Sequence, residues 1–174
     1  MTDPGVVVFG IPIPSTSKVF LTVVGVHVLV GVSCVVGGFI AMLSTKGSGR
    51  HVVAGAVYYW CLTVVFASTI ILSIMRWPYD NHLLTLGGLS FGSAATGRAA
   101  SRCQWRRWPQ VHIVGMGVSY VLLLTAFYVD NGPNLPLWRE LPAITYWVGP
   151  GLVGLPIIVY ALRFHPLAGR AQLK

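Results

Sequence analysis

The stretch from Gln110 to Trp147, QVHIVGMGVSYVLLLTAFYVDNGPNLPLWRELPAITYW, decides the fold class. A histidine near its start leads into an apolar run that continues to Val129 without a Lys, Arg, Asp or Glu. At about 1.5 Å per residue, a helix over 111–129 is just long enough to cross a bilayer. Asp130-Asn131-Gly132-Pro133 then favours a turn. The stretch predicts a membrane-spanning helix followed by a polar loop.

Composition places the rest of the chain in a membrane as well. Of the 174 residues, 55% are hydrophobic and only 9% are charged, and the mean hydropathy is +0.72. A soluble domain typically has about 25% charged residues. The net charge of +8 would suit a nucleic-acid partner, but the basic residues stand in short loops beside apolar spans, where they set orientation. We expect a polytopic protein surrounded by the lipid bilayer, with no nucleic-acid partner and no separate soluble domain.

Five apolar segments alternate with polar or turn-forming residues. The predicted spans cover residues 18–44, 51–75, 82–100, 111–129 and 144–164. Residues 1–17 carry the chain breakers Pro4, Gly10, Pro12 and Pro14 and predict an irregular lead-in, while residues 165–174 would form a cytoplasmic tail. The lead-in lacks the basic start of a signal peptide, so we expect no cleavage. The sequence predicts an all-α transmembrane bundle of about five spans, forming a single domain over residues 18–164.

Small residues indicate which spans pack closely. The third span is the richest in them, with Gly87, Gly88, Gly92, Ser93, Ala94, Ala95 and Gly97. Gly88 and Gly92 have the GxxxG spacing that lets two membrane helices approach, and Gly31, Gly37 and Gly38 allow the same in the first span. We therefore expect the third span at the centre of the bundle. Pro150 and Pro156 predict a kinked or locally broken fifth helix.

The basic residues predict the orientation. With five spans, nine of the twelve Lys and Arg residues fall on one side: Lys46, Arg50, Arg98, Arg102, Arg106, Arg107, Arg163, Arg170 and Lys174. Only Lys18, Arg76 and Arg139 fall on the other side. Because cytoplasmic loops carry the excess of positive charge, the N-terminus is expected outside and the C-terminus inside the cell.

Motifs for catalysis or structural metal binding are absent from the sequence. Cys34, Cys61 and Cys103 form no CxxC pair, so neither a zinc site nor a disulfide framework is indicated. The chain also lacks a Gly-rich phosphate loop and an HExxH motif, and the spacing of Asp130 and Glu140 does not support a carboxylate dyad. The sequence names no catalytic residue and leaves open whether the protein is an enzyme.

A short internal repeat draws attention to two histidines. His51 opens HVVAGAVYY and His112 opens HIVGMGVSY, and both segments read H-x-V-x-x-x-V-x-Y. Each segment starts a span behind an arginine-bearing loop on the predicted cytoplasmic side. Spans one and two, and spans three and four, would then be two related hairpins.

Two neutral imidazoles from facing helices are the ligands of a low-spin b-type haem. Gly55, Gly115 and Gly117 would leave room for the flat macrocycle, and Arg102 and Arg106 would neutralise its propionates. In the simpler interpretation, His51 and His112 are interfacial residues that hydrogen-bond lipid headgroups or a loop carbonyl.

Two other side chains have a functional and a structural interpretation. His27 lies about 12 Å into the first span, where an ionisable residue is a candidate functional site. Its structural alternative is a buried histidine bonded to a Ser, a Thr or a backbone carbonyl. Met116, one turn after His112, would be an axial ligand or, in the structural alternative, packing.

The spacing of these residues resembles a known family. The pattern comprises Lys46-Gly47, His51-x3-Gly55-x2-Tyr58 and His112-x3-Met116-x2-Ser119-Tyr120. It is similar to a family of small bacterial multi-pass integral membrane proteins catalogued only as a domain of unknown function, over roughly residues 19–130. The resemblance implies a helix bundle in the cell membrane, the inner membrane of a bacterium, and no established activity.

Three functional hypotheses follow from the sequence. The first is electron transfer through a haem b held by His51 and His112. The second is a non-catalytic accessory or scaffold subunit that docks on other membrane subunits through the small-residue helices. The third is a lipid- or quinone-binding membrane protein in which Arg102 and Arg106 hold an anionic headgroup and Trp105 and Trp108 fix the depth.

Overall fold

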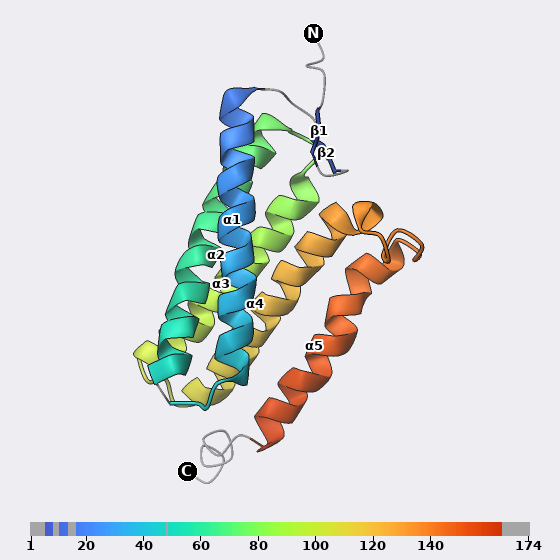
Figure 1. Ribbon diagram of the computed structural model, residues 1–174. Coiled ribbons are helices and arrows are strands. Elements are labelled where there is room, and N and C mark those ends of the chain that lie inside the picture. The colour runs from blue at the N-terminus through green and yellow to red at the C-terminus, as the bar shows by residue number, and fades with distance from the viewer. Residues whose placement is uncertain (1–5, 9–10, 14–16, 48, 165–174) are drawn as a thin grey trace. The chain divides into compact units, whose positions relative to one another are not determined.

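The computed structural model describes residues 6–8, 11–13, 17–47 and 49–164. Its helices are α1 (Lys18–Leu43), α2 (Gly49–Met75), α3 (Asn81–Arg102), α4 (Trp108–Asn131), the short 3-10 helix η1 (Gly132–Asn134) and α5 (Ile144–Phe164) (Figure 1). Every predicted span coincides with one α-helix, and no end differs by more than three residues. The predicted all-α transmembrane bundle is confirmed.

The expectation for the N-terminal lead-in is wrong in part. Val6–Val8 forms strand β1 and pairs in antiparallel fashion with strand β2, Ile11–Ile13, so that Val6 lies opposite Ile13 and Val8 opposite Ile11. β-Branched residues favour extended strands, and the two strands consist of Val and Ile except for Pro12. The remaining residues before Ser17, and the expected tail at 165–174, lie outside the described residues.

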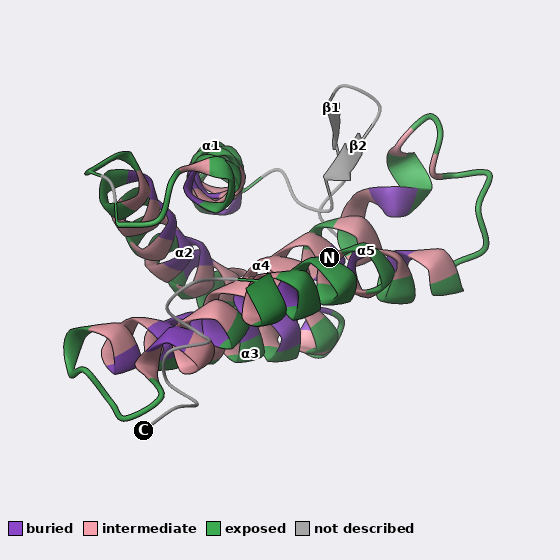
Figure 2. Ribbon diagram, turned by 90° about the horizontal axis from the view of Figure 1, so that it is seen from below, coloured by how far each residue is buried: buried purple, intermediate pink, exposed green. Residues whose placement is uncertain are grey.

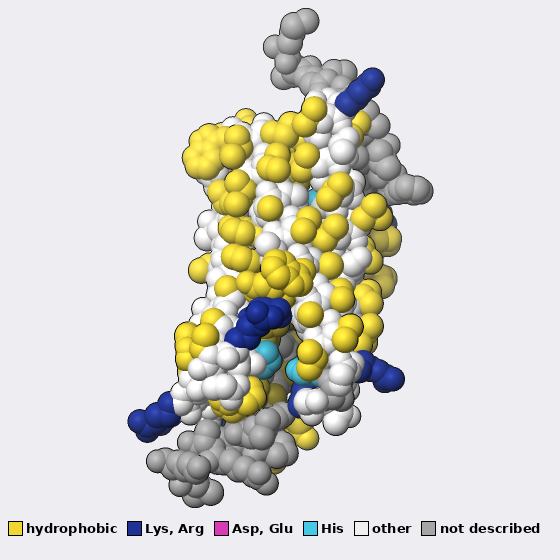
Figure 3. All heavy atoms as spheres, turned by 90° about the vertical axis from the view of Figure 1, so that its left-hand side faces the viewer, with side chains coloured by type: hydrophobic (Ala, Val, Ile, Leu, Met, Phe, Trp, Pro, Cys, Tyr) yellow, Lys and Arg dark blue, Asp and Glu magenta, His cyan; other side chains and the backbone are white. Residues whose placement is uncertain are grey.

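Four helices in the described part of the chain are long and apolar enough to cross a membrane: α1, α2, α4 together with η1, and α5. Helix α3 has 22 residues, about 33 Å of helix, but its glycines and hydroxyl side chains make it less apolar. Figure 3 shows hydrophobic side chains over the middle of one face and Lys and Arg toward its upper and lower ends. This distribution is typical of a protein embedded in a bilayer.

The chain divides into two compact units, Met1–Thr85 and Leu86–Lys174, and the division falls inside α3. In the first unit, α1 and α2 run side by side in opposite directions (Figure 1). Cys34, Gly37 and Ala41 are buried on α1 and follow each other at spacings of three and four residues. Figure 2 shows α1 buried along one side only. That side packs on α2, where a Cβ added to Gly37 would lie 3.3 Å from the Tyr58 nitrogen.

In the second unit, α4 and α5 form another antiparallel pair (Figure 1). A Cβ added to Gly117 of α4 would lie 2.6 Å from a side-chain carbon of Ile158 on α5. The loop between these helices is held by Tyr146, whose hydroxyl donates to the Trp138 carbonyl at 2.9 Å. The Trp138 ring packs at 4.2 Å on Tyr128. Helix α5 is continuous through Pro150 and Pro156, so the local break allowed by the sequence does not form.

The native Cys103 can report the predicted orientation, because it is exposed just after α3 whereas Cys34 is buried. We expect a membrane-impermeant maleimide to leave Cys103 unmodified in intact cells and to modify it after permeabilisation. A cysteine introduced as Asn134→Cys, at the exposed end of η1, should react in intact cells. Reversed accessibility of the two positions would overturn the N-outside orientation.

Candidate functional site

The two repeat histidines form the same kind of hydrogen bond, each within its own hairpin. The His51 Nδ1 lies 2.8 Å from the Ala41 carbonyl oxygen of α1. The His112 Nδ1 lies 3.0 Å from the Gly97 carbonyl oxygen of α3. A carbonyl oxygen only accepts, so Nδ1 donates in both rings. In the neutral ring, the lone pair that can bind a metal is then on Nε2.

A second interhelical hydrogen bond occurs at equivalent sequence positions in the two hairpins. The Cys34 thiol donates to the Tyr58 carbonyl at 3.5 Å, and the Ser90 hydroxyl donates to the Ser119 carbonyl at 2.8 Å. Tyr58 and Ser119 each lie seven residues after the repeat histidine. Likewise, Cys34 and Ser90 each lie seven residues before the carbonyl that the histidine contacts. The internal repeat predicted from one nine-residue motif therefore extends to both helices of each hairpin.

The backbones of α3 and α4 approach each other closely at Gly115. A Cβ added to Gly115 would lie 2.7 Å from the Ser93 carbonyl oxygen and 2.8 Å from the Gly97 Cα. Gly92 of the predicted GxxxG pair is not at this contact, because a Cβ on Gly92 would meet no described atom within 4 Å. The same is true of Gly31 in α1. Which glycine is used depends on the rotation of the helix about its axis, and spacing alone does not determine rotation.

The space expected beside the histidines is only partly present. Gly115 is in contact with the α3 backbone and Gly117 with Ile158, so neither leaves room for a macrocycle. A Cβ added to Gly55 would meet no described atom within 4 Å, so Gly55 retains the expected open space. The prediction was therefore wrong for Gly115 and Gly117, whose missing side chains let neighbouring helices approach.

His27 has the polar partner of its structural alternative. Its Nδ1 lies 2.8 Å from the Ser68 hydroxyl of α2, and that hydroxyl donates to the Val65 carbonyl at 2.8 Å. Ser68 therefore accepts from Nδ1 of His27, which satisfies the imidazole inside the hairpin. No cluster of three or more His, Cys, Asp or Glu side chains suited to a metal ion occurs among the described residues.

Lys46 shares the carbonyl that orients His51. Its ammonium donates to the Ala41 carbonyl at 3.0 Å and to the Met42 carbonyl at 2.7 Å, which satisfies acceptors at the end of α1. Burial lowers the pKa of Lys46 from its usual value. The sequence marked Lys46 as an orientation signal and as part of the family pattern, but it did not reveal this contact, which depends on backbone oxygens.

The remaining candidate residues lie at the end of α3, in the turn that follows it and on α4. Arg102 is the last residue of α3, Arg106 lies in the following turn, and both are exposed. Neither arginine takes part in the ion pairs Arg76–Asp80 and Arg139–Glu140. Met116 is half-buried on α4, one helical turn beyond His112.

Sequence reasoning found both repeat histidines but missed the groups that hold them. The Ala41 and Gly97 carbonyls have no sequence signature of their own, because a backbone oxygen is present at every residue. Comparison of the chain with protein-family models, with curated proteins and with solved structures found no match.

Proposed function

We propose that the protein is an integral membrane electron-transfer protein that binds a b-type haem through His51 and His112. The observation that supports this proposal most strongly is that both imidazoles make the same hydrogen bond. Each has Nδ1 fixed by a backbone carbonyl of its own hairpin. Metal-binding histidines usually have their second nitrogen held in this way, which fixes the tautomer and orients the ring.

The polar side chains suit the chemistry of this group, although Gly115 and Gly117 do not provide the space expected for it. A bis-histidine haem supplies one-electron transfer at its iron. His51 and His112 would hold it through Nε2, while the Ala41 and Gly97 carbonyls hold the rings against rotation. Arg102 and Arg106 are exposed cations that would pair with the propionates.

An accessory-subunit function remains the second candidate, because α3 carries an exposed stripe. Thr85, Leu89, Gly92 and Thr96 follow each other at spacings of three and four residues, and all are exposed. The hydroxyls of Thr85 and Thr96 donate to backbone carbonyls of α3 itself. The stripe is therefore small and largely apolar, as surfaces that pack against another membrane helix are.

An optical spectrum of the purified protein, expressed with added haem precursor, tests the proposal. We expect sharp bands in the reduced-minus-oxidised spectrum and about one haem per chain by pyridine haemochrome assay, because two imidazoles give low-spin iron. His51→Ala and His112→Ala should each abolish these bands. His82→Ala, at the exposed start of α3, is the matched control and should keep them.

Circular dichroism would establish that each variant retains its helices. A colourless wild-type protein, or bands that persist in either ligand variant, would contradict haem binding by this pair. The colourless result would favour the accessory-subunit function.

A further inference from the structure

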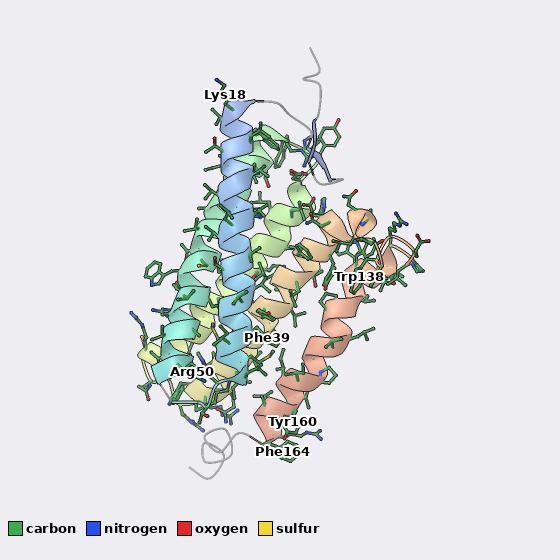
Figure 4. All side chains as sticks on the ribbon, viewed as in Figure 1. Lys18, Phe39, Arg50, Trp138, Tyr160 and Phe164 are labelled. Atoms are coloured by element: carbon green, nitrogen blue, oxygen red, sulfur yellow. The ribbon has the colours of Figure 1, made fainter. Side chains whose placement is uncertain are left out.

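A groove lies at the loop end of the α1–α2 hairpin, within the first unit. It is lined by Phe39, Ile40 and Leu43 from the end of α1, by Ser44 and Thr45 from the loop, and by Arg50 from the start of α2. Figure 4 labels Phe39 on α1 and Arg50 on α2, both near the connection between these helices. Its volume of about 480 Å³ lies within the range of about 300–1,000 Å³ for small-molecule sites. We propose that this groove binds one anionic phospholipid.

The charge of the groove suits an anion. No Asp or Glu occurs between Pro4 and Tyr79 in the sequence, and Arg50 forms no ion pair among the described residues. Lys46 is also nearby, but its ammonium is bonded to the Ala41 and Met42 carbonyls. Arg50 is therefore the cation that lines the groove. An arginine fork can bind a phosphate through two hydrogen bonds.

The apolar wall explains why the anion would be a lipid. Phe39, Ile40 and Leu43 are 50%, 41% and 69% exposed, and they occupy the last turns of a helix apolar enough to span the membrane. Along the chain, the hydroxyl residues Ser44 and Thr45 follow this apolar segment, and Arg50 comes after them. This order matches the order of groups along a phospholipid, in which the acyl chain leads to the glycerol and then the phosphate. A free phosphate ion would use the cation and leave the apolar wall exposed to water or hydrocarbon.

The groove is on the side that the distribution of basic residues predicts to be cytoplasmic, where anionic lipids attract basic residues. The inference is independent of haem binding, because it uses neither repeat histidine. Its occupant would be a structural or regulatory lipid held at the bend of the hairpin.

Native mass spectrometry of the full-length protein in detergent micelles, titrated with defined lipids, tests the proposal. We expect wild type to bind one phosphatidylglycerol more tightly than phosphatidylcholine of the same acyl chains. Arg50→Gln should weaken phosphatidylglycerol binding about fivefold, as expected for one basic residue near an anionic headgroup, and should leave phosphatidylcholine binding unchanged. Phe39→Ala should weaken both lipids, because it shortens the apolar wall.

The matched control is Arg163→Gln, which removes the same charge from the exposed end of α5 and should bind like wild type. Arg50→Lys keeps the charge but not the planar fork, so it should bind phosphatidylglycerol more weakly than wild type and more tightly than Arg50→Gln, which separates charge loss from misfolding. The proposal is overturned if Arg50→Gln binds phosphatidylglycerol like wild type or if Arg163→Gln weakens it equally. Competition by millimolar inorganic phosphate would also overturn it and would indicate a site for free phosphate.

Discussion

Replacing Gly115 by alanine is expected to lower the free energy of unfolding by about 3 kcal/mol, the upper part of the usual range for overpacked sites. The added Cβ would lie 2.7 Å from the Ser93 carbonyl oxygen and 2.9 Å from the Gly97 nitrogen. These are backbone atoms, so no side chain can rotate away and the helices must separate. Separation would also weaken the nearby bond from His112 to the Gly97 carbonyl. Thermal unfolding in detergent, followed by circular dichroism, measures the loss.

Gly55→Ala is the matched control for this substitution. Both glycines lie in the first turns of a second hairpin helix, but a Cβ at Gly55 would meet no described atom within 4 Å. Alanine favours a helix over glycine by about 1 kcal/mol, so Gly55→Ala should be neutral or stabilising. Equal stability of the two variants would show that α3 and α4 are not in backbone contact at Gly115.

Removing Arg76 is expected to cost more stability than removing its partner Asp80. The two form an ion pair of 3.0 Å at the turn before α3, with side chains 34% and 10% exposed. Arg76→Gln leaves a nearly buried carboxylate without its cation, and we expect a loss of about 2 kcal/mol after allowing for the exposure of the arginine. Asp80→Asn leaves the Arg76 guanidinium accessible to water, and the amide oxygen of the new side chain can still accept its hydrogen bond. The loss of stability should therefore be about 1 kcal/mol.

The exposed pair Arg139–Glu140 supplies the control, because its side chains are 64% and 74% exposed. Arg139→Gln should change the stability by less than about 0.5 kcal/mol. Reaction of the buried Cys34 with a thiol-reactive dye during heating would follow unfolding of the first unit for the Arg76 and Asp80 variants. A larger loss for Asp80→Asn than for Arg76→Gln would contradict the expected asymmetry.

The helices were predictable because their signal is long and redundant. An apolar run such as 111–129, ended by Asp130-Asn131-Gly132-Pro133, leaves little choice of length or position. The two short strands were not predictable, because Gly10 and Pro12 favour either a break in the chain or a turn. Only the pairing of Val6–Val8 with Ile11–Ile13 decides between these alternatives. Element boundaries follow from composition, whereas pairing depends on contacts between segments.

The site was predictable to the level of residue type but not of contacts. The repeated motif singled out His51 and His112, yet it carried no information on the carbonyls that hold them. Glycine spacing was misleading for a similar reason. Gly92 and Gly97 look equivalent in the sequence, and the rotation of α3 determines that Gly97, not Gly92, lies against α4.

The hydrogen bonds between α1 and α2 also favour an order of assembly. Counted outward from the bend, they join residues 10 apart at His51 and Ala41, 24 apart at Cys34 and Tyr58, and 41 apart at His27 and Ser68. The entropic cost of closing a loop rises with its length, so the innermost contact is the cheapest to form first. Once it forms, each later contact closes only a short additional segment. The contacts of the hairpin can therefore form in sequence, starting at its bend, as the two helices enter the membrane together. The pairing of His27 with Ser68 would be the last to form.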